Sequence, residues 1–462
     1  MKFWEDKHKL ILLIFFLAYI GYFLLTSFLR QNNFHTGKFD LGNMDQTVWN
    51  TIHGRIFEMS DENGIIISRL AFHADVILVL ISPLYLIWED PKMLLLLQVL
   101  IVAAGSFFVY AIALEIIKNK NYALLLSFAY LLNPAVERAN LYDFHPVVLA
   151  ATFLLATFYF YIKKNYKLFI FFAVLSALCK EEIWAAVSLF GLLLFFQQKK
   201  RLLGGLFFFT SISIFYLLIW HIIPAVSGAQ HFAISYYSDL GDSPSNIVIS
   251  ILSSPDKVLD ILMQPDRINY LVKLFYPLGF LSLFSPLYLI FAIPDLFINL
   301  LSQRSLFREF YYHYTATISP FIFISAIYSI AILKRKIAPN IINAYILLFS
   351  LFAAYLYGPL PGARGQDIAM YTKIVKNQSF INKYLVAIPK NYSVAVTNNL
   401  GAHVSQRQKV YVLPHGIGEA DFIIFLRIRG VVEKPLLLKV ENDPNYSLIL
   451  KKEEFLVFKK IN

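Results

Sequence analysis

Long apolar segments recur along this chain, and they limit what it can fold into more than any other feature. Segments 10–29, 92–117, 202–223 and 338–357 are nearly free of charged residues. A helix of roughly 20 apolar residues crosses the hydrocarbon layer of a bilayer, which is about 30 Å thick. Charged residues make up 15% of the chain, against roughly 25% in soluble domains. The sequence therefore predicts an all-α polytopic membrane protein.

The same pattern predicts about eleven transmembrane helices. The segments assigned to them are 10–29, 92–117, 122–138, 146–162, 167–179, 183–196, 202–223, 270–285, 286–301, 315–333 and 338–357. Segment 73–88 is apolar but short and contains a proline, so it is a short span or a re-entrant or interfacial element. The first segment follows MKFWEDKHK without a small-residue cleavage site and is interpreted as a retained span.

Lysine and arginine residues gather in five short clusters between the apolar segments. These are Lys2/Lys7/Lys9, Lys118/Lys120, Lys163/Lys164/Lys167, Lys199/Lys200/Arg201 and Lys334/Arg335/Lys336. All five fall on one membrane face if 73–88 does not cross and 167–196 crosses twice. The positive-inside rule makes that face cytoplasmic, which places the N-terminus inside and the C-terminus outside an integral plasma-membrane protein. The basic residues behind the net charge of +11 are thus interpreted as determinants of membrane topology, and no nucleic-acid partner is expected.

The last hundred residues change in character. Their β-type runs are 392–398, 408–414, 420–428 and 446–460, of which the last alternates like a hairpin. A helix is expected within 398–407. We therefore predict a transmembrane domain over 1–360, with a long first outer loop at 30–91, and a small extracytoplasmic α/β domain over 361–462.

The first outer loop contains FDLGNMDQTVWNTIHGR, residues 39–55. Its apolar residues recur at helical spacing, which predicts an amphipathic helix on the membrane surface with its acids toward water. Asp40 is either a catalytic general base or metal ligand at the rim of an outward cavity, or an acid that stabilises a helix N-terminus. Asp45 is a second candidate metal ligand, although it faces partly away from Asp40. Arg55 either clamps a substrate phosphate or suits the helix C-terminus.

Two further outer segments add imidazoles and a carboxylate. His73 begins the short apolar element and is either a substrate-binding group or an ordinary interfacial histidine. Asp143 and His145 lie in YDFHP between two predicted spans. Asp143 is a candidate metal ligand and His145 a candidate substrate-binding residue, although a His-Pro step can also simply start a helix.

The tetrapeptide CKEE interrupts the apolar run 167–196 with three charged residues. Charged groups at membrane depth must pair or face water, which makes them functional candidates. Glu181 and Glu182 are therefore candidate catalytic residues. The alternative is an ordinary outer turn between two short spans.

Cations and aromatic residues gather in LSQRSLFREFYYHY. The candidates are Arg304, Arg308, His313 and Tyr314. They suit the phosphate of a bound substrate. They suit plain lipid headgroups and an interfacial aromatic belt equally well.

Several segments, taken in order, resemble the predicted membrane proteins called domain of unknown function 2079. They are FDLGNMDQTVWNTIHGR, HADVILVLISPLYLIW, LLLLQVLIVAAGSFFVYAIA, FHPVVLA, CKEEIWAAVSLFGLLL, YHYTATISPFIF and SVAVTNNLGAHVSQRQKVYVLP. The resemblance runs from about residue 30 to about residue 430. That family in turn resembles the GT-C glycosyltransferases, which include the protein O-mannosyltransferases and the aminoarabinose transferase of lipid A.

The resemblance implies a GT-C-like core of helices whose first outer loop carries an acid on a juxtamembrane helix. A second acid is implied in the next outer loop. By position, Asp40 matches the first acid and Asp143 the second. FDLG and YDFH lack the strict paired-acid motif of some GT-C enzymes, so dependence on a divalent metal such as Mg²⁺ or Mn²⁺ stays open. The implied donors are sugars linked to polyprenyl phosphate.

The sequence thus favours a membrane glycosyltransferase that moves a sugar from a polyprenyl-phosphate donor to an acceptor at the extracytoplasmic face. Membrane lipids are expected as its surrounding partners. One alternative is a transporter or flippase of lipid-linked cargo, which would need polar groups through both leaflets. The other is a non-enzymatic scaffold or assembly protein, in which Asp40→Asn and Glu181→Gln would leave function intact.

Overall fold

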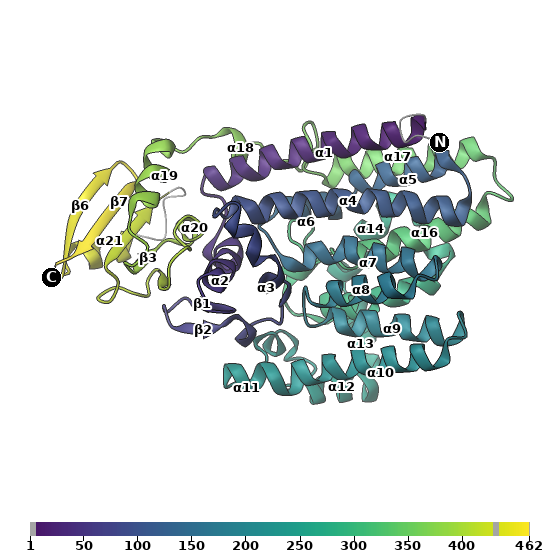
Figure 1. The fold of residues 1–462 in the computed structure, drawn as a ribbon, viewed down its shortest axis with the longest axis horizontal. Helices are drawn as coiled ribbons and strands as arrows, with labels where there is room; N and C mark the ends of the chain where they lie inside the picture. The colour runs from purple at the N-terminus through teal and green to yellow at the C-terminus, as the bar shows by residue number, and fades with distance from the viewer. Residues whose placement is uncertain (1–5, 428–433, 462) are drawn as a thin grey trace.

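The computed structural model describes residues 6–427 and 434–461. A helical bundle, a group of short elements from the first outer loop and a C-terminal sheet domain follow one another along its long axis (Figure 1). Lys2 of the first basic cluster and Ile428, the last residue of one predicted strand, lie outside the described residues.

Four helices in the described part of the chain are long and apolar enough to cross a membrane, judged by length and composition. They are α1 (Lys7–Asn32), α4 (Lys92–Ile117), the run Arg201–Ser227 and α17 (Pro339–Tyr357). The run Arg201–Ser227 joins α10 (Arg201–Leu217), a π-turn η5 (Leu218–Ile222) and α11 (Ile223–Ser227). Each overlaps a predicted span, as expected where lipid leaves the backbone no other hydrogen-bond partners.

Shorter helices complete the bundle. They are α5 (Lys120–Leu131), α6 (Pro134–Leu141), α7 (Pro146–Ile162), α8 (Tyr166–Ala177), α9 (Ile183–Phe196) and α16 (Ser319–Leu333). The short pair α8 and α9, with CKEE in the turn between them, agrees with the prediction. The segment 122–138 instead forms two helices, because the side-chain oxygen of Asn133 accepts from the backbone N–H of Ala135 at 3.0 Å and starts a new helix.

The predicted helix over 270–285 is wrong, whereas the one predicted over 286–301 is present as a continuous helical run, Pro286–Leu301. The chain forms α14 (Pro265–Phe275), η7 (Tyr276–Leu278), η8 (Leu281–Phe284), η9 (Pro286–Ala292) and α15 (Ile293–Leu301). Gly279 and Phe280 have left-handed φ angles of 56° and 59°. Prolines in the same stretch remove backbone donors, so the apolar pattern continues where the helix does not.

The first outer loop folds into short elements between the bundle and the C-terminal domain (Figure 1). They are a π-turn η2 (Lys38–Gly42), α2 (Asn43–Ile52), β1 (Glu58–Ser60), β2 (Ile66–Ser68), η3 (Arg69–Ala71), α3 (Ile77–Ile81) and η4 (Ser82–Leu86). The strands β1 and β2 pair antiparallel. The helices α3 and η4 are too short to cross a bilayer, in agreement with the topology that keeps 73–88 on one face.

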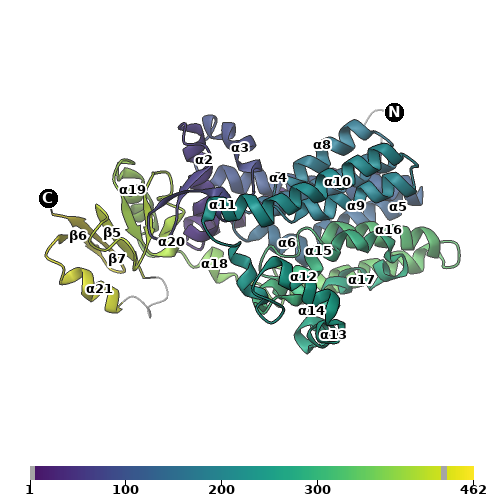
Figure 2. The same cartoon turned by 90° about the horizontal axis from the view of Figure 1, so that it is seen from below.

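Further short helices lie between α11 and α16. They are η6 (Phe232–Tyr237), α12 (Pro244–Ser253), α13 (Pro255–Leu262) and η10 (Ser305–Arg308). Figure 2 shows α12, α13 and α14 on the side of the bundle away from α8.

The C-terminal domain is an α/β unit, as predicted. Its strands are β3 (Val394–Val396), β4 (Val410–Val412), β5 (Phe422–Leu426), β6 (Tyr446–Lys452) and β7 (Phe455–Lys460), in the order β4-β3-β5-β7-β6. Its helices are α18 (Ala369–Thr372), α19 (Gln378–Ala387), α20 (Asn398–Gly401) and α21 (Lys434–Glu441). The strands β4, β3 and β5 are parallel, and β5, β7 and β6 are antiparallel. Because β3, β4 and β5 are buried throughout, their sequences are continuous apolar runs.

The first outer loop docks on this domain. The backbone N–H of Val412 donates to the carbonyl of Glu62 at 3.0 Å. Gly42 and Gly401 pack against the Lys38 side chain, and a Cβ at Gly401 would lie 2.2 Å from the Cβ of Lys38. The close approach fixes the position of η2 against α20.

Asp45 is fully buried at the same junction. Its carboxylate accepts hydrogen bonds from the hydroxyls of Tyr85 and Ser405 at 2.6 and 2.5 Å, and from the Gln406 amide at 3.2 Å. Burial raises the pKa of Asp45 to about 6, against the opposing effect of these hydrogen bonds. The prediction that both acids of this helix face water is therefore wrong for Asp45, because the C-terminal domain covers that face.

Candidate functional site

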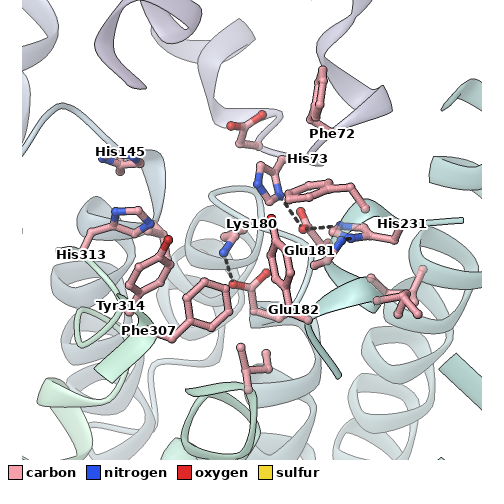
Figure 3. Close-up of a pocket in the computed structure, with 18 of the residues that line it drawn as sticks. Phe72, His73, His145, Lys180, Glu181, Glu182, His231, Phe307, His313 and Tyr314 are labelled. Atoms are coloured by element: carbon pink, nitrogen blue, oxygen red, sulfur yellow. Dashed lines mark hydrogen bonds and ion pairs between the residues drawn. The ribbon is translucent and has the colours of Figure 1, made fainter. Parts of the chain in front are cut away.

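A cavity of about 1130 Å³ lies where the first-loop elements meet the bundle (Figure 3). Its polar wall comes from η2, the start of the short apolar element at residue 73, the segment just before α7, the turn between α8 and α9, the segment after α11 and the segment 302–318. Its apolar wall includes Phe215, Ile219, Ile247, Val248, Ile251, Phe297, Ile298 and Leu301 from α10, η5, α12 and α15. The predicted site residues that line it are Asp40, His73, His145, Glu181, Glu182, Arg304, His313 and Tyr314. The fold thus gathers candidates from five separate segments of the chain into one site.

Asp40 lies in η2 at the border of the cavity, with its side chain 29% exposed. The Nε2 atom of His145 lies 3.1 Å from one carboxylate oxygen. The hydroxyl of Tyr142 donates to the other oxygen at 3.0 Å. Asp40 is therefore held by two neighbours while its carboxylate still faces the cavity.

These neighbours also set the charge of Asp40. Burial by itself would raise the pKa of the carboxyl. The hydrogen bonds from His145 and Tyr142 and the charge of Arg30 outweigh burial, so the pKa lies below its ordinary value. An ionised carboxylate at neutral pH can accept a proton from a hydroxyl group.

His145 is itself fixed from two sides. Its backbone N–H donates to the Gln98 side chain at 2.9 Å, and its ring stacks on His313 with 3.7 Å between ring centroids. Burial, followed by the nearby charge of His145, holds the pKa of His313 well below its usual value. His313 is therefore a neutral imidazole at physiological pH.

Asp143 lies behind Asp40 rather than in the main cavity. It forms a buried ion pair with Arg30 and accepts from the backbone N–H of Gly37 at 2.9 Å. Asp143 and Arg30 line a second pocket of about 350 Å³, which Asp40 also borders. A guanidinium already neutralises Asp143, and Asp45 belongs to a different network, so this pair of predicted metal ligands does not fit a shared divalent cation.

Glu181 is the centre of a buried cluster (Figure 3). Its Oε1 atom lies 2.7 Å from His73 Nδ1 and 3.1 Å from His231 Nε2. Its Oε2 atom accepts from the backbone N–H of Ala74 at 2.9 Å. Burial alone would raise the pKa of Glu181, but the two imidazoles and the charge of Lys180 bring it well below the ordinary value. The cluster therefore holds an ionised carboxylate between two histidines.

Cations complete the polar wall. The Nζ atom of Lys180 lies 2.7 Å from a carboxylate oxygen of Glu182, and Figure 3 shows this pair beside the Glu181 cluster. The Arg304 guanidinium is exposed and lies 4.0 Å from the centre of the Tyr236 ring. Tyr314 lines the cavity beside Phe307, with 4.3 Å between ring centroids. Cations next to an apolar chamber suit a ligand with an anionic head and a hydrocarbon tail.

Besides Asp143, three predicted residues do not line the cavity. Arg55 donates to the Asn50 side chain at 2.8 Å at the end of α2. Arg308 is buried and donates to Asp266 at 2.8 Å. Asp45 is held by the C-terminal domain, as described above. Each of the three has a local structural partner.

Several charged or titratable residues of the site were not predicted from the sequence, and three of them matter most to its geometry. Arg30 neutralises Asp143, and His231 completes the Glu181 cluster. Lys38 is buried, and burial lowers its pKa to about 7. The histidine-rich outer segments were visible in the sequence, but no local spacing connects His231 to residues 73 and 181.

Comparison with solved structures gives the fold class. ArnT from Cupriavidus metallidurans, a GT-C glycosyltransferase solved bound to undecaprenyl phosphate, matches with a TM-score of 0.52 and 11% sequence identity. The match covers 96% of this chain and 98% of the ArnT chain. At that identity the likeness shows the fold alone. None of the curated proteins compared matches this sequence.

The family of the chain follows from its sequence. The model of the family described as "Predicted membrane protein (DUF2079)" matches residues 30–423, which is most of the chain. That range includes the first outer loop, the bundle apart from most of α1, the strands β3 and β4, and the start of β5. The protein therefore belongs to the DUF2079 family of membrane proteins and has an ArnT-like fold.

Proposed function

We propose that this protein is a membrane glycosyltransferase that moves a sugar from a polyprenyl-phosphate donor to an acceptor at the extracytoplasmic face. The observation that carries the proposal is the position of Asp40. Its ionised carboxylate, held by His145 and Tyr142, borders a large cavity with one apolar and one cationic wall. The ArnT-like fold supports the same class of reaction.

The cavity suits a lipid-linked donor. The apolar wall from α10, α12 and α15 can hold the isoprenoid chain, and Lys180 and Arg304 can hold the phosphate. Undecaprenyl phosphate, the lipid bound to ArnT, has both parts. A lipid-linked sugar also meets the need for a donor outside the cytosol, where nucleotide sugars are not available.

The chemistry follows from this placement. Asp40 accepts the proton of the acceptor hydroxyl while the oxygen of that hydroxyl forms a bond to the anomeric carbon of the sugar. The bond between that carbon and the phosphate oxygen breaks, and the polyprenyl phosphate leaves with the electron pair. Lys180 and Arg304 stabilise the charge that builds on the leaving phosphate. The second pocket, which also borders Asp40, is the side from which an acceptor can approach.

The test uses the full-length protein in nanodiscs with radiolabelled polyprenyl-phosphate sugars and a crude envelope fraction as acceptor. Wild type is compared with Asp40→Asn, and with Asp256→Asn as a matched control on the exposed start of α13. We expect transfer by wild type and the control, and a loss of at least ~100-fold in Asp40→Asn. Transfer by Asp40→Asn at the wild-type rate would exclude Asp40 as the base. Absence of transfer and of donor hydrolysis across a broad donor panel would contradict the function.

A further inference from the structure

We propose that His73, Glu181 and His231 form a binding site for a transition-metal ion such as Zn²⁺, at the polar wall of the main cavity. The three side chains come from the start of the short apolar element, the turn between α8 and α9, and the segment after α11. These residues differ from Asp143 and Asp45, the metal ligands expected from the sequence.

The geometry of the three side chains supports the site. Their potential ligand atoms all lie within 4.8 Å of one another. Glu181 and His231 are buried, and 23% of the His73 side chain is exposed. In the structure Glu181 Oε1 is shared by both imidazoles, at 2.7 and 3.1 Å. Moving each imidazole nitrogen away from Oε1 by less than about 1 Å gives the spacing of roughly 3.3–3.6 Å between ligands of a four-coordinate metal bound at roughly 2.0–2.2 Å.

The donor set identifies the class of metal. Two imidazoles and one carboxylate are the ligands of many catalytic zinc sites, which keep a further position open. Mg²⁺ and Ca²⁺ prefer oxygen ligands throughout. All three residues line the cavity, so the open position would face a bound ligand.

The surroundings of the cluster support its carboxylate ligand. The backbone N–H of Ala74 fixes Oε2 of Glu181 at 2.9 Å, which orients the other oxygen toward the imidazoles. The N–H of Ala233 donates to His231 Nδ1 at 3.2 Å. A metal bound to Nε2 would shift the ring proton of His231 to Nδ1, which could then no longer accept the hydrogen bond from Ala233. The loss of this hydrogen bond is small compared with the gain of three bonds to the metal.

A metal here would lie on the same wall of the cavity as Lys180, the residue that the proposed function places next to the donor phosphate. Its role would be to supply positive charge to a phosphate oxygen, and that role rests on the proposed function. Binding of the metal does not depend on it. The site is therefore tested without any donor or acceptor.

The experiment uses full-length protein in detergent, purified through a tag without histidines and stripped with a chelator. Co²⁺ is titrated while visible absorption is recorded, and Zn²⁺ is added afterwards in competition. We expect one equivalent of Co²⁺ with the strong d–d bands of a four- or five-coordinate site, displaced by Zn²⁺. Glu181→Gln and His231→Asn should weaken binding by at least ~100-fold, while His415→Asn, in the C-terminal domain, should bind as wild type does.

Two results would overturn the site. One is the absence of a stoichiometric Co²⁺ spectrum in wild type, which needs no variant to interpret. The other is equal binding by wild type and by a folded Glu181→Gln protein, judged by size-exclusion chromatography. Metal binding without glycosyl transfer would leave the site standing and count against the proposed function alone.

Discussion

The side-chain oxygen of Asn398, at the start of α20, accepts hydrogen bonds from the backbone N–H groups of Lys38 and Phe39 at 2.8 and 3.3 Å. These two residues directly precede Asp40. A residue of the C-terminal domain thus holds the π-turn that presents the proposed base. The C-terminal domain is therefore a structural support of the site.

Removal of this support should reduce catalysis more than donor binding. Asn398→Ala leaves two backbone donors without their partner, at a cost of about 1–3 kcal/mol. We expect kcat to fall about tenfold or more with little change in the KM for the donor, measured in nanodiscs. Asn442→Ala, on the exposed end of α21, is the control. A change in KM alone would contradict a positioning role.

The pH dependence of activity should report the partners of Asp40. His145 and Tyr142 lower the pKa of Asp40, and a base works only when ionised, so activity is lost as pH falls through that pKa. Replacing His145 with Ala removes one of these stabilising contacts and raises the pKa. The acid limb of the kcat/KM profile should then move up by about one pH unit. Tyr142→Phe should move it in the same direction. An acid limb that stays in place in both variants would assign it to another group.

Lys38 should make stability depend on pH. Burial, then the nearby charge of Arg69, lowers its folded pKa to about 7 from 10.5. Between these values the unfolded chain binds more protons than the folded one, so the free energy of unfolding rises as pH rises. We expect the apparent Tm of wild type to gain from this effect between pH 7 and pH 9.

Lys38→Met should remove that gain, because it keeps the length of the side chain without the charge. Exposed Lys383→Met is the matched control and should behave as wild type does. Parallel curves of Tm against pH for wild type and Lys38→Met would show that Lys38 does not titrate in this window.

Asp45 should prove structural. Asp45→Ala leaves the hydroxyls of Tyr85 and Ser405 without their acceptor, and we expect a loss of about 2–3 kcal/mol in stability. Asp45→Asn should be much milder, because an amide oxygen can still accept from Tyr85 and the amide nitrogen can donate to Ser405. Thermal unfolding in detergent measures both. A stable Asp45→Asn protein that has lost transfer activity would restore Asp45 as a functional residue.

Much of the fold was predictable from local patterns. Apolar length identified α1, α4, α10 and α17, because lipid leaves the backbone no alternative to a helix. The continuous apolar runs of the C-terminal domain identified β3, β4 and β5 for a similar reason, since both faces of these strands are buried. The predicted helix failed at 270–285, where Pro277 and the left-handed residues Gly279 and Phe280 break the backbone while hydrophobicity continues.

By itself the sequence determined that this is a membrane protein with acids and histidines in the segments between its apolar runs, and through its ordered motifs it determined the family. Only the tertiary structure decided which of those groups meet. Asp40 and Asp45 are five residues apart, yet one borders the cavity and the other is buried against Ser405. His73, Glu181 and His231 share one site across more than 150 residues of chain. Hydrophobic patterning acts over a few turns of helix, whereas a site is assembled by contacts between segments that have no common periodicity.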